Sequence, residues 1–103
     1  MNFWKNPNYP EGAERAELHI SGSEDSCDYL YNLIVEIAEP FDVSSHLDDT
    51  VVIYTSTKKA KDVLHTLYEV LSIKHPNLVG RKDGIYFNNG VVYFKDCEIF
   101  VHS

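Results

Sequence analysis

The stretch TVVIYTSTKKAKDVLHTLYEVLSIK, residues 50–74, decides the fold because it joins the strongest strand pattern in the chain to a helix. Residues 50–55 are β-branched and almost wholly apolar, which is typical of a central strand. Thr55, Ser56 or Thr57 is the expected N-cap of a helix over about residues 58–74. The buried side of this helix consists of apolar residues at helical spacing: Val63, Leu64, Leu67, Val70 and Leu71.

Downstream, after Pro76 ends the helix, the chain has the pattern of a three-stranded meander. Asn89-Gly90 lies between two short apolar runs, and this dipeptide favours a hairpin because a type I′ turn needs positive φ at both central positions. Lys95-Asp96 makes a second turn. We therefore expect strands at residues 85–87, 91–94 and 98–101.

Upstream, residues 16–22 (AELHISG) alternate between apolar and polar side chains. In a strand, Leu18 and Ile20 lie on one face while Glu17 and His19 lie on the other, which is typical of a half-buried strand. This pattern predicts a strand that opens the domain and ends at Gly22.

A first helix follows, with Ser23 as the expected N-cap and Pro40 as the stop signal. At about 100° per residue, one arc of this helix is apolar. It contains Cys27, Leu30, Leu33, Ile34, Ile37 and Ala38. The opposite arc, here called the acidic stripe, contains Asp25, Asp28, Asn32, Glu36 and Glu39. No lysine or arginine interrupts the acidic stripe.

These elements predict an α+β domain in which two helices pack on one face of a mostly antiparallel sheet, in the order β-α-β-β-α-β-β-β. The third element, residues 41–46, alternates only weakly. If it is a strand, the first six elements have the ferredoxin-like order, which is the interpretation we prefer. If it is not, a right-handed crossover links residues 16–22 to residues 50–55.

The chain divides into an N-terminal arm, residues 1–15, and a single α+β domain, residues 16–103. The arm is rich in proline and has no apolar period, but it carries Phe3, Trp4 and Tyr9. Such side chains are costly to leave in water, so they pack either on the domain itself or on a partner. We treat them as candidate partner-binding residues.

Composition excludes several classes of protein. With 44% hydrophobic and 24% charged residues, the chain is that of a globular domain, and two cysteines are too few for a disulfide-dense scaffold. No apolar run is long enough to cross a membrane. The net charge of −7 argues against direct binding of nucleic acid. The N-terminus has no apolar leader segment, so we expect a cytoplasmic protein with reduced, largely buried thiols.

The sequence carries no recognisable catalytic signature. The five histidines lie in no Ser/His or Cys/His pattern, and neither His-x₃₋₅-His nor Glu-x-x-His occurs. Ser21-Gly22-Ser23 lacks the further glycines and the lysine of a nucleotide-binding loop. We therefore expect no catalytic residue, no metal site and no cofactor, and a non-enzymatic protein.

Charge is distributed unevenly, because residues 1–50 carry eleven acids and two bases. A concentrated acidic surface speeds association with a basic one, and basic surfaces are typical of sites that hold nucleic acid. We expect a small inhibitor, of the immunity type or the phage anti-defence type, that docks its acidic stripe on a larger protein as a nucleic-acid mimic. The alternatives are a homodimerising or ligand-sensing regulatory module, and acidity that serves only solubility.

Overall fold

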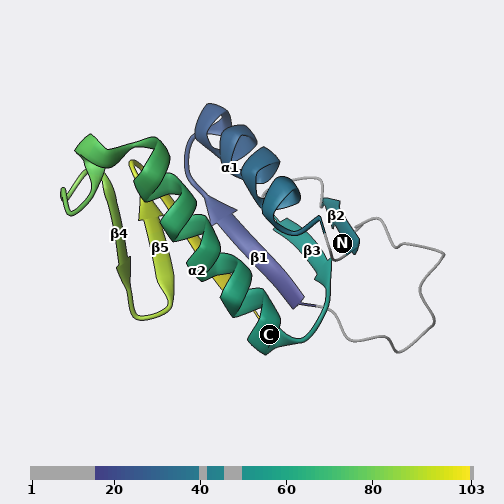
Figure 1. Cartoon of the computed structure of the whole chain (residues 1–103). Helices are drawn as coiled ribbons and strands as arrows, with labels where there is room; N and C mark the ends of the chain where they lie inside the picture. The colour runs from purple at the N-terminus through teal and green to yellow at the C-terminus, as the bar shows by residue number, and fades with distance from the viewer. Residues whose placement is uncertain (1–15, 40–41, 46–49, 103) are drawn as a thin grey trace.

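One antiparallel sheet with two helices on one face makes up the described part of the chain, which is residues 16–39, 42–45 and 50–102 of a computed structural model (Figure 1). Among these residues the elements are β1 (Ala16–Ser21), α1 (Glu24–Ile37), β2 (Asp42–Ser45), β3 (Thr50–Tyr54), α2 (Thr57–Lys74), a 3₁₀ turn (Pro76–Leu78), β4 (Ile85–Asn88), β5 (Val91–Phe94) and β6 (Cys97–His102). The predicted α+β class and element order are confirmed, including the weak strand within residues 41–46.

The strand order across the sheet is β2-β3-β1-β6-β5-β4, and every neighbouring pair is antiparallel. β1 and β2 therefore run parallel with β3 between them, which is the split arrangement of a ferredoxin-like core. The fourth strand of that core is β6, and not the strand that directly follows α2. β6 matches β1 in length, whereas the shorter β4 and β5 form a local hairpin that extends the sheet beyond β6.

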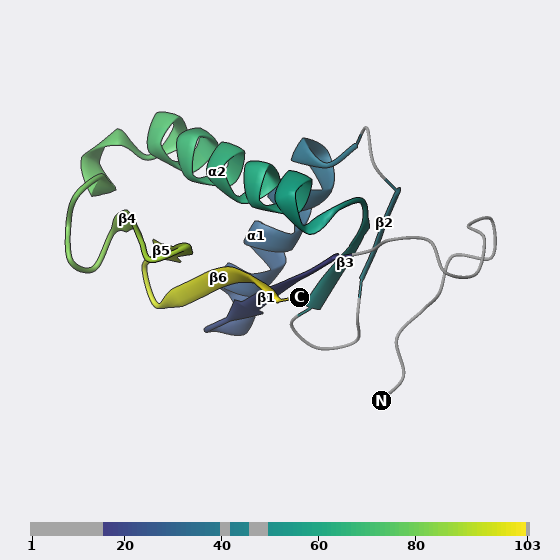
Figure 2. The ribbon, with the colours of Figure 1, turned by 90° about the horizontal axis from the view of Figure 1, so that it is seen from below.

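The hydrophobic core lies between the sheet and the two helices. β1 buries Ala16, Leu18 and Ile20, in agreement with the alternation of its sequence. α1 contributes Leu30, Leu33 and Ile34, and α2 contributes Ala60, Val63, Leu64, Leu67 and Leu71. Figure 2 shows α2 extending along one side of the sheet, above β6. No described helix is long and apolar enough to cross a membrane.

The other face of the sheet, here called the open face, is not covered by any described helix. It carries the alternate side chains of the strands, because residues paired across antiparallel strands point to the same side. His19 stacks on Phe100 with ring centroids 5.4 Å apart, and Tyr86 stacks on Tyr93 at 4.4 Å. The register pairs Glu17 directly with His102.

The turns show how the ends of the elements are held. Asn89 and Gly90 have φ values of 52° and 78°, as the predicted hairpin requires. Ser23 is the N-cap residue of α1, but its side chain makes no capping hydrogen bond. Its backbone N–H and its hydroxyl instead donate to the carboxylate of Asp96, at 3.1 Å and 3.4 Å. The β1–α1 junction is thereby tied to the turn between β5 and β6.

Candidate functional site

The acidic stripe lies on the solvent side of α1. Asp25, Asp28, Asn32 and Glu36 are all exposed helix residues. Glu39 is also exposed, but it lies beyond the C-cap residue Ala38, in the turn that follows the helix. The structure therefore brings four of the five predicted residues onto one helical face and places the fifth just past its end.

Little positive charge compensates the stripe within the described residues. The ion-pair contacts there join His19 to Glu17 and Arg81 to Asp83, and neither involves α1. One base does lie near the N-terminal end of the stripe, because Lys95 and Asp25 line the same shallow cavity of about 240 Å³. Asp28 and Glu36 make no ion-pair contact with any described residue.

The three aromatic residues of the arm, Phe3, Trp4 and Tyr9, lie outside the described residues. Their assignment as partner-binding residues remains a prediction from the sequence.

A larger cavity of about 440 Å³ opens between α2 and the β4–β5 hairpin. Its walls include apolar side chains, Leu64 and Phe87 among them, and two nitrogen-bearing side chains, Lys61 and His65. The His65 ring stacks on Phe87 at 4.6 Å. Sequence reasoning did not find this cavity, because its walls come from α2, β4, β5 and β6, and only the packing of the hairpin against α2 creates it.

Cys97 is unsuited to nucleophilic chemistry. β6 begins at Cys97, one residue earlier than predicted, so this residue belongs to the strand and its side chain is buried in the core. Burial, together with the nearby Asp96 carboxylate, raises the pKa of the Cys97 thiol to about 11. Cys27 is half-buried on α1, with Sγ 4.0 Å from the carbonyl oxygen of Ile20. A thiolate, the reactive form, is therefore disfavoured at Cys97 near neutral pH.

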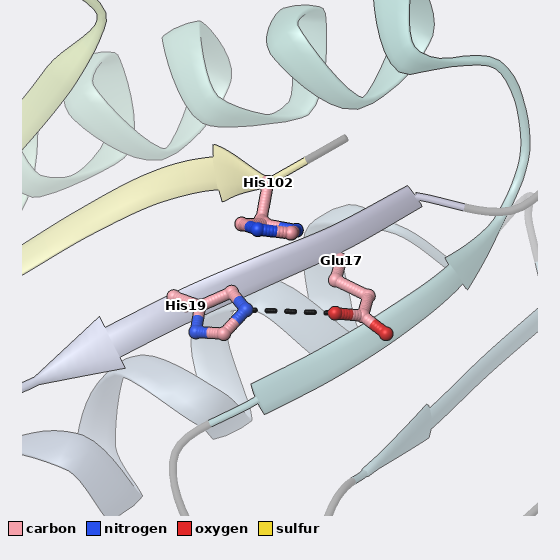
Figure 3. Close-up of side chains that lie close together, drawn as sticks. All are labelled: Glu17, His19 and His102. Atoms are coloured by element: carbon pink, nitrogen blue, oxygen red, sulfur yellow. Dashed lines mark ion pairs between the residues drawn. The ribbon is translucent and has the colours of Figure 1, made fainter.

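Sequence reasoning also missed a group of polar side chains on the open face, formed by Glu17, His19 and His102 (Figure 3). Their ligand-type atoms all lie within 4.8 Å of one another. Spacings such as His-x₃₋₅-His do not cover this arrangement, because Glu17 and His19 are two residues apart in a strand and His102 comes from β6. The available signal was the alternation of residues 16–22, which places Glu17 and His19 on one face.

Comparison of the chain with protein-family models, with curated proteins and with solved structures gave no match.

Proposed function

We propose that this chain is a non-enzymatic protein-binding module that inhibits a larger protein by docking the acidic stripe of α1 on a basic, nucleic-acid-binding surface. The observation that carries the proposal is a stripe with little compensating positive charge: exposed acids follow one face of α1, and the helix contains no lysine or arginine. The proposal places the protein in the cytoplasm, where its cysteines stay reduced.

The geometry of the stripe suits a nucleic-acid mimic. A helix rises about 1.5 Å per residue, so Asp28 and Glu36 lie about 12 Å apart along α1. The stripe therefore presents a row of separated negative charges on a rigid element packed against the sheet. Such a row attracts lysines and arginines that otherwise contact phosphates, and the attraction acts mainly on the rate of association.

The stripe can be tested by charge reversal with a matched control. In the stripe variant, Asp28→Lys is combined with Glu36→Lys. In the control variant, Asp62→Lys is combined with Glu69→Lys, which makes the same change in net charge at exposed sites on α2. Both variants should fold, because exposed substitutions change stability by only about 0.5 kcal/mol per site.

The assay begins with affinity capture from the native host or its competitor, using the parent and both variants. Binding rates of the captured protein are then measured at low and high salt. We expect the stripe variant to associate about tenfold more slowly than the control variant, with a difference that shrinks as salt rises. We also expect nucleic acid to compete for the captured protein. Equal rates for the two variants, or no competition by nucleic acid, would reject this function.

The cavity between α2 and the β4–β5 hairpin favours a second candidate, a ligand-sensing module. Its volume of about 440 Å³ falls within the range of small-molecule sites, about 300–1,000 Å³. Lys61 beside apolar walls would suit a ligand with an apolar body and a negative group. A thermal-shift screen with such compounds tests this candidate: a hit should lose its stabilising effect in Lys61→Ala and keep it in the stripe variant.

Homodimerisation is the third expectation that the sequence leaves open. Sedimentation analysis of the parent at several salt concentrations distinguishes it from charge-steered docking. An apolar dimer persists at high salt, whereas contacts steered by the acidic stripe weaken.

A further inference from the structure

We propose that Glu17, His19 and His102 form a binding site for a zinc-class divalent ion on the open face of the sheet. The site is independent of the acidic stripe, because it lies on the side of the sheet opposite to the helices.

The strand register brings the three residues together. Glu17 and His19 alternate along β1 and therefore point to the same face. β6 pairs with β1 so that His102 lies directly across from Glu17, and Phe100 lies across from His19. The ring centroids of His19 and His102 are consequently 5.1 Å apart. Figure 3 shows the three side chains gathered over the same part of β1.

The distances fit a tetrahedral ion. Zinc binds nitrogen and carboxylate oxygen at about 2.0–2.2 Å, which places neighbouring ligand atoms about 3.4 Å apart. The Nε2 atom of His19 and the Oε2 atom of Glu17 are already 3.5 Å apart. All three ligand atoms lie within 4.8 Å of one another. His102 is exposed and can move by the remaining ångström or so through a change of side-chain torsion.

A second observation also indicates a ligand at this position. The Nε2 atom of His19 is buried and makes no hydrogen bond to a described residue; its 3.5 Å contact with Oε2 of Glu17 is an ion pair only when the histidine is protonated. A buried polar atom without a hydrogen bond is destabilising and calls for an explanation. The Phe100 ring lies nearly parallel to the His19 ring, at 15°, and holds it in place. A metal ion between His19 and Glu17 would satisfy this nitrogen.

The types of donor atom select the class of ion. Two imidazoles and one carboxylate suit zinc and its transition-metal neighbours, whereas magnesium and calcium prefer sets of oxygen ligands. Three protein ligands leave one position of a tetrahedral ion to water or to a group from a partner. The ion would join the C-terminal strand β6 to the central strand β1, so binding should also stabilise the fold.

The test is a zinc titration of untagged protein, followed by calorimetry and by NMR of the histidine ring signals. We expect one zinc per chain, binding at micromolar concentration or below. We expect the ring signals of His19 and His102 to shift, and those of His65 and His75 to stay in place. Magnesium at the same concentration should cause no shift.

Matched variants decide whether these three residues hold the ion. His102→Gln and Glu17→Gln should each weaken zinc binding by at least about tenfold, since even residues outside the ligand set often cost 10–100-fold. His65→Gln, Glu98→Gln and Cys27→Ser should bind as the parent does. His102 is exposed, so its variant should melt like the parent without zinc and remains informative if Glu17→Gln fails to fold. Absence of binding, parent-like binding by His102→Gln, or equal loss in the His65→Gln control would overturn the proposal.

Discussion

Replacing Gly22 with alanine should destabilise the protein strongly, because this glycine sits where β1 turns into α1 against the start of β6. Its φ is 155°, a value that side-chain-bearing residues rarely adopt. A Cβ added there would collide with Sγ of Cys97, and would approach the Cα of Cys97 at 3.0 Å and the carbonyl oxygen of Asp96 at 3.1 Å. Two of these three neighbours are backbone atoms, which cannot move without disturbing β6.

The expected magnitude has two parts. Forcing a non-glycine residue into a disfavoured backbone region costs about 1–3 kcal/mol. Overpacking a core contact costs about another 1–3 kcal/mol. We therefore expect the free energy of unfolding to fall by about 2–6 kcal/mol, and the melting temperature of a domain of this size to fall by about 10 °C or more.

Gly90→Ala is the matched control. Gly90 also has positive φ, at 78°, but no atom lies within 4 Å of the position that its Cβ would occupy. This variant therefore has the backbone cost without the collision. Urea unfolding of the parent and of both variants measures the difference. A Gly22→Ala variant as stable as Gly90→Ala, or more stable, would refute a destabilising contact between position 22 and Cys97.

Three further predictions concern groups outside the proposed sites. Burial raises the pKa of Cys97 to about 11, so the folded state holds the thiol proton more tightly than the unfolded chain and the free energy of unfolding should fall as pH rises from about 9 to 11. Urea unfolding of the parent and of Cys97→Ala across that pH range checks this. Burial alone would raise the pKa of Asp96, but hydrogen bonds from Ser23 outweigh it and hold the pKa below its usual value. The stability that these bonds give should be present near neutral pH and lost as pH falls through the lowered pKa, and the acid unfolding of Asp96→Asn should not show this loss. Tyr29→Phe removes a hydrogen bond of 2.8 Å to Nε2 of His75 and should cost about 0.5–1.5 kcal/mol in thermal unfolding, whereas Tyr31→Phe should cost less.

Sequence patterns predicted most helices and strands correctly because the interactions that form these elements act within a few residues. Asn89-Gly90 adopts positive φ at both positions for reasons that lie in those two residues alone. The alternation of residues 16–20 and the helical spacing of Leu30, Leu33 and Ile34 also appear directly in the burial of these side chains. Ser56 caps α2 by accepting a hydrogen bond from the backbone N–H of Lys59, as one of the three predicted caps.

The hydrogen bonds at the N-terminus of α1 could not be predicted from local sequence. Ser23 stands at the predicted N-cap position, but its hydroxyl donates to Asp96, 73 residues away in sequence. No short stretch of sequence around Ser23 contains Asp96, so a local pattern could not predict this hydrogen bond. The close contact of Gly22 with Cys97 was likewise absent from the sequence pattern, although the glycine itself marked the end of the strand correctly.

The sequence by itself determined the order of helices and strands, the apolar side of each element and the acidic side of α1, because side-chain periodicity and turn chemistry act within a few residues. Tertiary structure alone decided that β6, and not β4, lies beside β1. This pairing joins two strands about eighty residues apart in sequence. The matched lengths of β1 and β6 and their buried apolar faces outweigh the closer position of β4 in the sequence. The same pairing places His102 beside Glu17 and His19, so the candidate metal site exists only once the sheet has formed.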